Sequence, residues 1–128
     1  MALELIPDTE RAAIVATALD YFEGWFDGDA ERMERALHPA LAKRSLGQVA
    51  SAGTELRDVT KEQMVTWTAV GEGKAVDRAP GRRIDVTVVD VHGNIASVVV
   101  DSDVYREYVH LVRTDDGWKI VNALWHFT

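Results

Sequence analysis

The chain has 128 residues, of which 47% are hydrophobic and 27% charged, and its formal net charge is −7 with an isoelectric point near 5.0. This length suits one ordinary domain with its own core, so we expect residues 1–128 to form a single domain. The acidic balance repels phosphate backbones, which argues against a nucleic-acid partner. The chain has no cysteine, which excludes disulfides and thiolate metal sites.

The distribution of hydrophobic residues argues against a secreted protein and against a membrane-spanning protein. The first ten residues, MALELIPDTE, contain neither a basic nor a long apolar segment, so we expect no signal peptide. No apolar run approaches the roughly 20 residues that a membrane span needs. We therefore expect a cytoplasmic protein with no membrane partner.

The first predicted element is a long helix with a broad apolar band. Its hydrophobic residues recur at helical spacing from Ile14 to Phe26. Asp8 is the expected cap at its start, and Gly28 follows its expected last residue, Asp27. We expect the small Gly24 within it to allow another element to pack closely.

A second, short helix is predicted to follow directly. Asp29 can cap its first turn, and its apolar residues extend to Leu37. The pair His38-Pro39 should end it, because the residue before a proline avoids the α conformation. His38 then suits either a position near the last helical carbonyls or a place in a pocket.

A third helix is predicted from a capping box formed by Thr60 and Gln63, and it carries Met64 and Trp67 on one face. The stretches on either side of this helix are patterned weakly. Residues 40–59 suggest one or two short strands around a Ser51-Ala52-Gly53 turn. Residues 72–83 contain glycines and a proline and are predicted to form a loop.

The last third of the chain has the period of β-strands. Four runs rich in β-branched and aromatic residues are separated by short turns, at residues 84–91, 95–100, 105–113 and 118–127. Short turns predict an antiparallel meander. Some strands are apolar on both faces, so helices would cover one face and a second copy of the chain could cover the other. We predict an α+β fold, with N-terminal helices packed in a curved, mostly antiparallel sheet.

Several of these segments resemble a known family. They are Tyr21–Ala30, Leu37-His38-Pro39, Leu41–Arg44 and the closing Gly117–Asn122 with Trp125. They are similar to the "putative lumazine-binding" branch of the nuclear transport factor 2-like superfamily. This resemblance implies a cone-shaped, cystatin-like fold with a pocket at its wide end, and a homodimer formed through the outer face of the sheet. The superfamily includes isomerases, dehydratases, cyclases and non-catalytic adaptors, so the fold does not determine the function.

Candidate ligand-binding residues are mainly aromatic. Tyr and Trp combine a flat apolar body with a polar atom, which suits both a core position and the wall of a pocket for a flat ligand. Asn122, which has apolar neighbours, either lies on the sheet surface or orients a ligand. We predict a pocket lined by Tyr21, Trp25, His38, Met64, Trp67, Asn122 and Trp125.

Candidate catalytic residues come from the third strand of the meander and the turn before it. Asp103 and His110 could act as acid and base, with Tyr108 as a hydrogen-bond donor. Asp103 equally suits a simple turn position. Strand alternation places Tyr108 and His110 on one face, whereas the opposite face, with Glu107, Val109 and Leu111, looks more like the core.

The same alternation in the last strand separates two further sets of residues. Trp118, Ile120, Asn122 and Leu124 are predicted to share one face, opposite Val121, Ala123, Trp125 and Phe127.

No motif indicates a metal or a cofactor. The four histidines lack the spacing of metal ligands, and the chain has no phosphate-binding loop. Three functions remain open. We favour a homodimer that binds a small, partly aromatic molecule. The alternatives are a small lyase or isomerase that uses Asp103, His110 or Tyr108, and a dimeric interaction module without a ligand.

Overall fold

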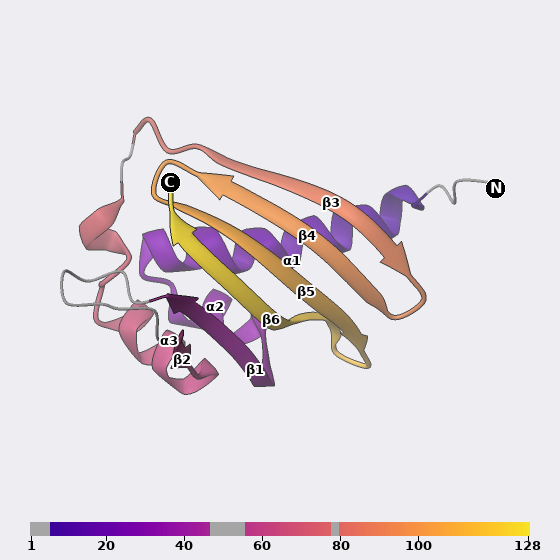
Figure 1. Ribbon diagram of the computed structural model, residues 1–128, viewed down its shortest axis with the longest axis horizontal. Helices are drawn as coiled ribbons and strands as arrows, with labels where there is room; N and C mark the ends of the chain where they lie inside the picture. Colours follow the sequence, from indigo (N-terminus) through magenta and orange to yellow (C-terminus); the bar gives the residue numbers. More distant parts are fainter. Residues whose placement is uncertain (1–5, 47–55, 78–79) are drawn as a thin grey trace.

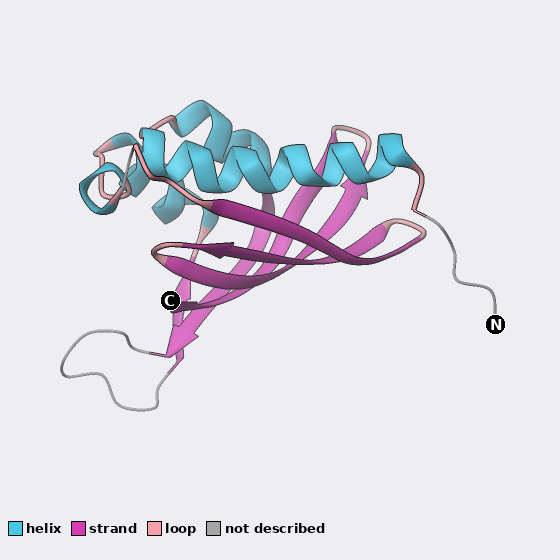
Figure 2. Ribbon diagram, turned by 90° about the horizontal axis from the view of Figure 1, so that it is seen from above, coloured by secondary structure: helices cyan, strands magenta, loops and turns pink. Residues whose placement is uncertain are grey.

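The computed structural model describes residues 6–46, 56–77 and 80–128, so the predicted turn at residues 51–53 lies outside the described chain. The described residues form helices on one side of a six-stranded sheet (Figures 1 and 2). The helices are α1 (Asp8–Asp27), α2 (Ala30–Ala36), α3 (Lys61–Ala69) and a short 3-10 helix, η1 (Lys74–Val76). The strands are β1 (Leu37–Leu46), β2 (Leu56–Val59), β3 (Ile84–His92), β4 (Ile95–Ser102), β5 (Tyr105–Thr114) and β6 (Gly117–Phe127).

The sheet has the strand order β2-β1-β6-β5-β4-β3. Strands β3 to β6 form the predicted antiparallel meander. Strand β1 pairs with β6 in parallel and with β2 antiparallel, so residues from the first half of the chain extend the sheet beyond the C-terminal strand. The predicted α+β fold, with helices in a curved and mostly antiparallel sheet, is confirmed.

The helix starts and ends mostly follow the predicted signals. Gly28 ends α1 with φ 68°, a conformation that glycine adopts without strain. Asp29 caps α2 by accepting a hydrogen bond from the backbone of Arg32, and Thr60 opens α3 in a capping box. The prediction for Asp8 is wrong, because Pro7 occupies the cap position and Asp8 is the first helical residue.

His38 and Pro39 do not end a helix. Helix α2 stops at Ala36, and Leu37 already lies in β1, opposite Ile120 of β6. The pairing with β6 therefore overrides the helical periodicity that extended to Leu37. The register between β1 and β6 shifts between Leu37 and Ala42, and this irregularity accommodates Pro39, which cannot donate a ladder hydrogen bond.

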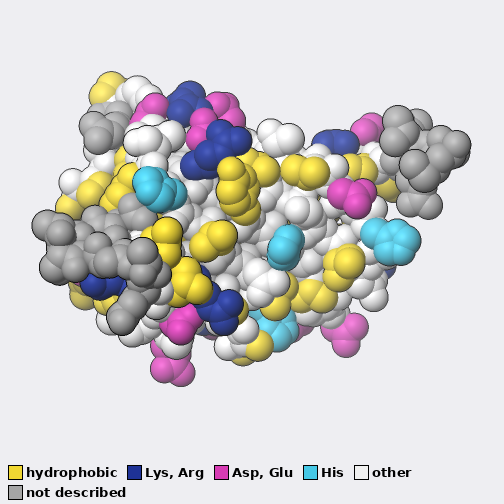
Figure 3. All heavy atoms as spheres, in the orientation of Figure 1, with side chains coloured by type: hydrophobic (Ala, Val, Ile, Leu, Met, Phe, Trp, Pro, Cys, Tyr) yellow, Lys and Arg dark blue, Asp and Glu magenta, His cyan; other side chains and the backbone are white. Residues whose placement is uncertain are grey.

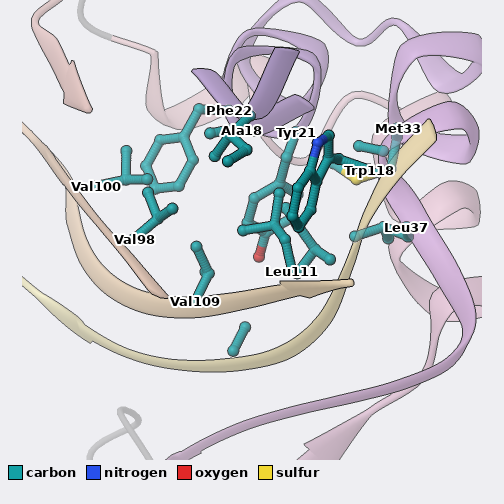
Figure 4. Close-up of a cluster of buried hydrophobic side chains, with 14 of the residues drawn as sticks. Ala18, Tyr21, Phe22, Met33, Leu37, Val98, Val100, Val109, Leu111 and Trp118 are labelled. Atoms are coloured by element: carbon teal, nitrogen blue, oxygen red, sulfur yellow. The ribbon is translucent and has the colours of Figure 1, made fainter. Parts of the chain in front are cut away.

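Helix α1 lies along the concave face of the sheet (Figure 4) and supplies five of the twenty buried hydrophobic residues of the core in the described chain. Its residues Ala18, Tyr21 and Phe22 face the buried strand residues Val98 and Val109, and each of the five is at most 5% exposed. The hydroxyl of Tyr21 points from the helix toward the curved strands (Figure 4). This arrangement leaves the ends of the aromatic side chains of α1 next to β5 and β6.

A bulge in β6 corrects the predicted faces of that strand. Leu111 pairs with Ile120, but His110 pairs with Asn122, so Val121 is an extra residue in β6. The extra residue inverts the alternation, and Ala123 is buried whereas Asn122 is exposed. The simple alternation, which placed Asn122 on the face of Trp118 and Ile120, is therefore wrong beyond Ile120.

Ion pairs and close packing hold α2 against α1. Arg32 donates to Asp20 and Glu23 over 2.9 Å each, and Arg35 also donates to Asp20 over 2.9 Å. A side chain at Gly24 would meet Arg32 Cβ at 3.1 Å, so the expected close approach at this glycine is confirmed.

Candidate functional site

A cavity of about 210 Å³ lies between the helices and the concave face of the sheet. Most of its lining is aromatic or aliphatic, and α3 and the segment that follows this helix contribute Met64, Trp67 and Glu72. The lining residues are Tyr21, Phe22, Trp25, Lys43, Val59, Met64, Trp67, Glu72, Tyr105, Glu107 and Trp125.

A polar cluster of three residues forms the floor of this cavity. Tyr21 of α1 donates its hydroxyl proton to Glu107 Oε1 of β5 over 2.9 Å. Lys43 Nζ of β1 donates to the same carboxylate oxygen over 3.1 Å and to the hydroxyl oxygen of Tyr21. All three residues are at most 8% exposed. Because the ammonium and the carboxylate are both buried, each depends on the other for its stability.

The surroundings of Tyr21 keep its hydroxyl protonated. Burial raises the pKa of Tyr21 well above the usual value of 10.0, and the negative charge of Glu107 raises this pKa further. Tyr21 is thus a neutral phenol at physiological pH. Its proton stays on the side facing Glu107, while its oxygen accepts from Lys43.

The aromatic walls are held by contacts among themselves. Trp25 Nε1 donates to the hydroxyl of Tyr105 over 3.1 Å, and the rings of Tyr105 and Trp125 meet edge to face at 5.3 Å. Gly73 packs directly against Trp25, because any side chain at position 73 would collide with the backbone carbonyl of Trp25. Trp125 Nε1 is buried and has no hydrogen-bond partner among the described residues.

Comparison with known proteins identifies the family. The sequence profile of the family described as "Putative lumazine-binding" matches residues 9–126. The chain belongs to this family. Its fold is that of the nuclear transport factor 2-like superfamily, so the suspected resemblance is confirmed.

Solved structures of low sequence identity share the fold of this family member. A protein of unknown function from Silicibacter pomeroyi matches with a TM-score of 0.77 and 17% identity, covering 97% of this chain and 100% of its own. A protein of unknown function from Shewanella baltica matches with a TM-score of 0.78 and 18% identity, and the match covers 98% of each chain. A protein from Streptomyces avermitilis that is described as a putative dehydratase matches with a TM-score of 0.65 and 18% identity. This match covers 96% of this chain and 99% of the other. No curated protein matches the chain significantly.

The structure places five of the seven predicted ligand-binding residues around the cavity. These are Tyr21, Trp25, Met64, Trp67 and Trp125. The other two, His38 and Asn122, line a broad, open hollow on the opposite, outer face of the sheet, together with His110. There Asn122 Nδ2 lies 3.3 Å from His110 Nδ1. The predicted set thus divides between two faces of the sheet.

The three predicted catalytic residues do not converge on one pocket. Asp103 follows β4 in a turn, where it accepts from the backbone of Arg83 over 3.2 Å and pairs with its guanidinium at 3.4 Å. Tyr108 is 53% exposed on the outer face of β5, and His110 is exposed on the same face. The predicted core face of β5, with Glu107, Val109 and Leu111, is confirmed.

Sequence reasoning did not select Lys43, Glu107 or Tyr105 as site residues. A signal for Glu107 was present, because a carboxylate on the same strand face as Val109 and Leu111 requires buried partners. Lys43 gave no such signal, since its place depends on the parallel pairing of β1 with β6, opposite Ala123.

The described part of the chain contains no group of three or more His, Asp or Glu residues positioned to hold a metal ion. Among the described helices, none is both long and apolar enough to cross a membrane. The polar side chains that line the cavity are the ammonium of Lys43, the carboxylates of Glu72 and Glu107 and the phenols of Tyr21 and Tyr105.

Proposed function

We propose that the chain binds a small, partly aromatic molecule in the cavity between α1, α3 and the sheet. The observation that carries this proposal is the lining, in which aromatic walls surround a single polar cluster. Ligand pockets typically combine apolar walls with a few convergent polar groups. The volume of about 210 Å³ is below the roughly 300–1,000 Å³ of pockets for drug-sized ligands, which favours a molecule of one or two rings.

A cavity-blocking variant tests this proposal with naphthalene as the probe. Val59 lines the cavity from β2, so Val59→Trp should fill part of it and abolish binding measured by ligand-observed NMR. Val89 is 58% exposed on β3 and lies outside the cavity, so Val89→Trp is the matched control and should bind like the natural protein. Equal binding by both variants would refute the cavity as the site.

We also propose that the outer face of the sheet forms a homodimer. The centre of this face carries uncharged and histidine side chains, including Val99, Tyr108, His110 and Leu124, and two of them are about half exposed. Figure 3 looks onto this face, where most charged side chains lie nearer the margins. Two copies of a chain with net charge −7 repel each other least where such a neutral surface meets its own copy.

Sedimentation velocity and native mass spectrometry test the dimer. Tyr108→Glu should convert a dimer into a monomer, because it places two like charges in a self-complementary interface. Val70, 71% exposed at the end of α3, provides the control Val70→Glu, which should remain dimeric. An intact dimer in the Tyr108→Glu variant would exclude this face as the interface. Native mass spectrometry would also report any ligand that co-purifies.

A lyase or isomerase activity is the second candidate, and one observation favours it. Glu107, Lys43 and Tyr21 bring a carboxylate, an ammonium and a phenol together beside the cavity, which is the inventory of acid–base catalysis on a carbonyl compound. Exchange of the α-protons of 2-tetralone in D₂O, followed by NMR, tests it. Exchange that is equally fast with the natural protein and with Glu107→Gln would exclude Glu107 as the base.

A further inference from the structure

Two hydrogen-bonding groups at the polar floor of the cavity have no partner within the cluster. They are one N–H donor of Lys43 and one carboxylate oxygen of Glu107. A lysine ammonium has three N–H donors. Lys43 uses two of them, toward Tyr21 and toward Glu107, and the third has no acceptor among the described residues. The side chain of Lys43 is 10% exposed and lines the cavity, so this third donor is available to a ligand.

The matching acceptor belongs to Glu107. The hydrogen bonds from Tyr21 and from Lys43 both end on Oε1. Oε2 of the same carboxylate accepts no hydrogen bond from the part of the chain that the structure describes, and Glu107 lines the cavity. A donor and an acceptor therefore lie side by side at the floor, and because they belong to an ion pair both are charge-assisted.

The rest of the lining restricts the ligand further. The charged side chains that line the cavity are one ammonium, Lys43, and two carboxylates, Glu107 at the floor and Glu72 in an exposed position. An anionic ligand would meet a net negative lining. The indole rings of Trp25 and Trp125 in the lining favour a flat ring system.

We propose that the cavity selects a planar, uncharged cyclic amide, whose carbonyl oxygen accepts from Lys43 and whose adjacent N–H donates to Glu107 Oε2. This inference rests on the proposed binding function, and it adds the chemical class of the ligand. A cyclic amide presents an acceptor and a donor on neighbouring atoms of one edge, which is the complement of the pair that the floor offers. It also leaves the ion pair of Lys43 and Glu107 intact.

Three uncharged two-ring probes isolate the proposed interaction. 2-Quinolone carries the complete amide edge, coumarin is the corresponding lactone with a ring oxygen in place of the N–H, and naphthalene has no polar atom. We expect the natural protein to bind 2-quinolone at least about tenfold more tightly than coumarin, because coumarin leaves the charged acceptor of Glu107 unpaired. Dissociation constants come from ligand-observed NMR titration.

A variant that removes the whole polar cluster is the decisive comparison. Tyr21→Phe, Lys43→Met and Glu107→Leu together leave no member of the cluster unpaired, and apolar replacement of a complete buried pair is often neutral for stability. This triple variant should lose the preference for 2-quinolone over coumarin, and its naphthalene titration reports whether the cavity is still open. Lys119→Met, which removes a lysine bonded to the backbone of Arg35, is the matched control and should keep the preference.

The outcomes separate this inference from the proposed function. If naphthalene binds but 2-quinolone and coumarin bind equally, or if the triple variant keeps the preference, the cyclic-amide inference is overturned and the binding function stands. If none of the three probes binds the natural protein, both fail. 2-Naphthoate, the anionic relative of naphthalene, should bind more weakly than naphthalene, and tighter binding would refute the selection for an uncharged ligand.

Discussion

Two tryptophans in different surroundings show how the cavity affects stability at the scale of single residues. Trp67 is half-buried in the wall of the cavity, whereas Trp118 is 5% exposed in the core. We expect Trp67→Ala to lower the free energy of unfolding by about 1–2 kcal/mol. Trp118→Ala should lower it by about 3–5 kcal/mol, since it creates a cavity in packed surroundings. Urea denaturation measures both values, and equal losses would mean that Trp67 is an ordinary core residue.

Asp20 gives the chain a component of stability that depends on pH. Burial alone would raise the pKa of Asp20, but the hydrogen bonds and charges of Arg35 and Arg32 outweigh it and hold this pKa below the usual 3.8. A lowered folded-state pKa contributes stability above the unfolded value, and this contribution is lost as the pH falls through the folded value.

The natural protein should therefore lose free energy of unfolding between about pH 5 and pH 2 more steeply than Asp20→Asn does. Asp58, an exposed carboxylate paired with Arg44, supplies the control Asp58→Asn. Urea titrations at a series of pH values measure the slopes. Parallel curves for the natural protein and Asp20→Asn would contradict the assigned role of the Arg32 and Arg35 contacts.

At the scale of elements, local signals predicted most of the fold but not the pairing of its two halves. Helix periodicity and capping residues located α1, α2 and α3, and the short turns predicted the meander. The parallel pairing of β1 with β6 is a tertiary choice with no local signal, and it converted the expected helix end at His38 into a strand.

The same limit explains why half of the site was missed. Aromatic residues at helical spacing indicated a pocket, and Tyr21, Trp25 and Trp67 do line one. Lys43 and Glu107 come together only because β1 and β5 both flank β6 in the sheet. A carboxylate on the core face of a strand was the one local sign of this cluster.

The bulge at Val121 can be tested by two neighbouring substitutions. Ala123 is 5% exposed, so Ala123→Asp should cost about 2–4 kcal/mol by burying a charge. Asn122 is exposed, and Asn122→Asp should change stability by less than about 0.5 kcal/mol. Thermal or urea unfolding distinguishes the two. A larger loss of stability for Asn122→Asp than for Ala123→Asp would contradict the bulge and support a simple alternation along β6.

At the scale of the whole molecule, the two faces of the sheet carry different groups of side chains. The concave face holds the core and the cavity, and the outer face carries exposed hydrophobic residues such as Tyr108 and Leu124. A dimer through the outer face would leave the cavity of each copy on the opposite side of the sheet. Ligand binding and dimer formation should then be separable, so Tyr108→Glu should lower the mass of the assembly and leave naphthalene binding unchanged.

The four tryptophans of the chain allow one measurement of the central claim, that a small molecule binds in this cavity. Trp25, Trp67 and Trp125 line the cavity, and Trp118 does not. In a ¹⁵N-labelled sample titrated with naphthalene, the account predicts that three indole N–H signals shift together and that the signal of Trp118 stays in place. Four unmoved signals, or a shift confined to Trp118, would contradict it.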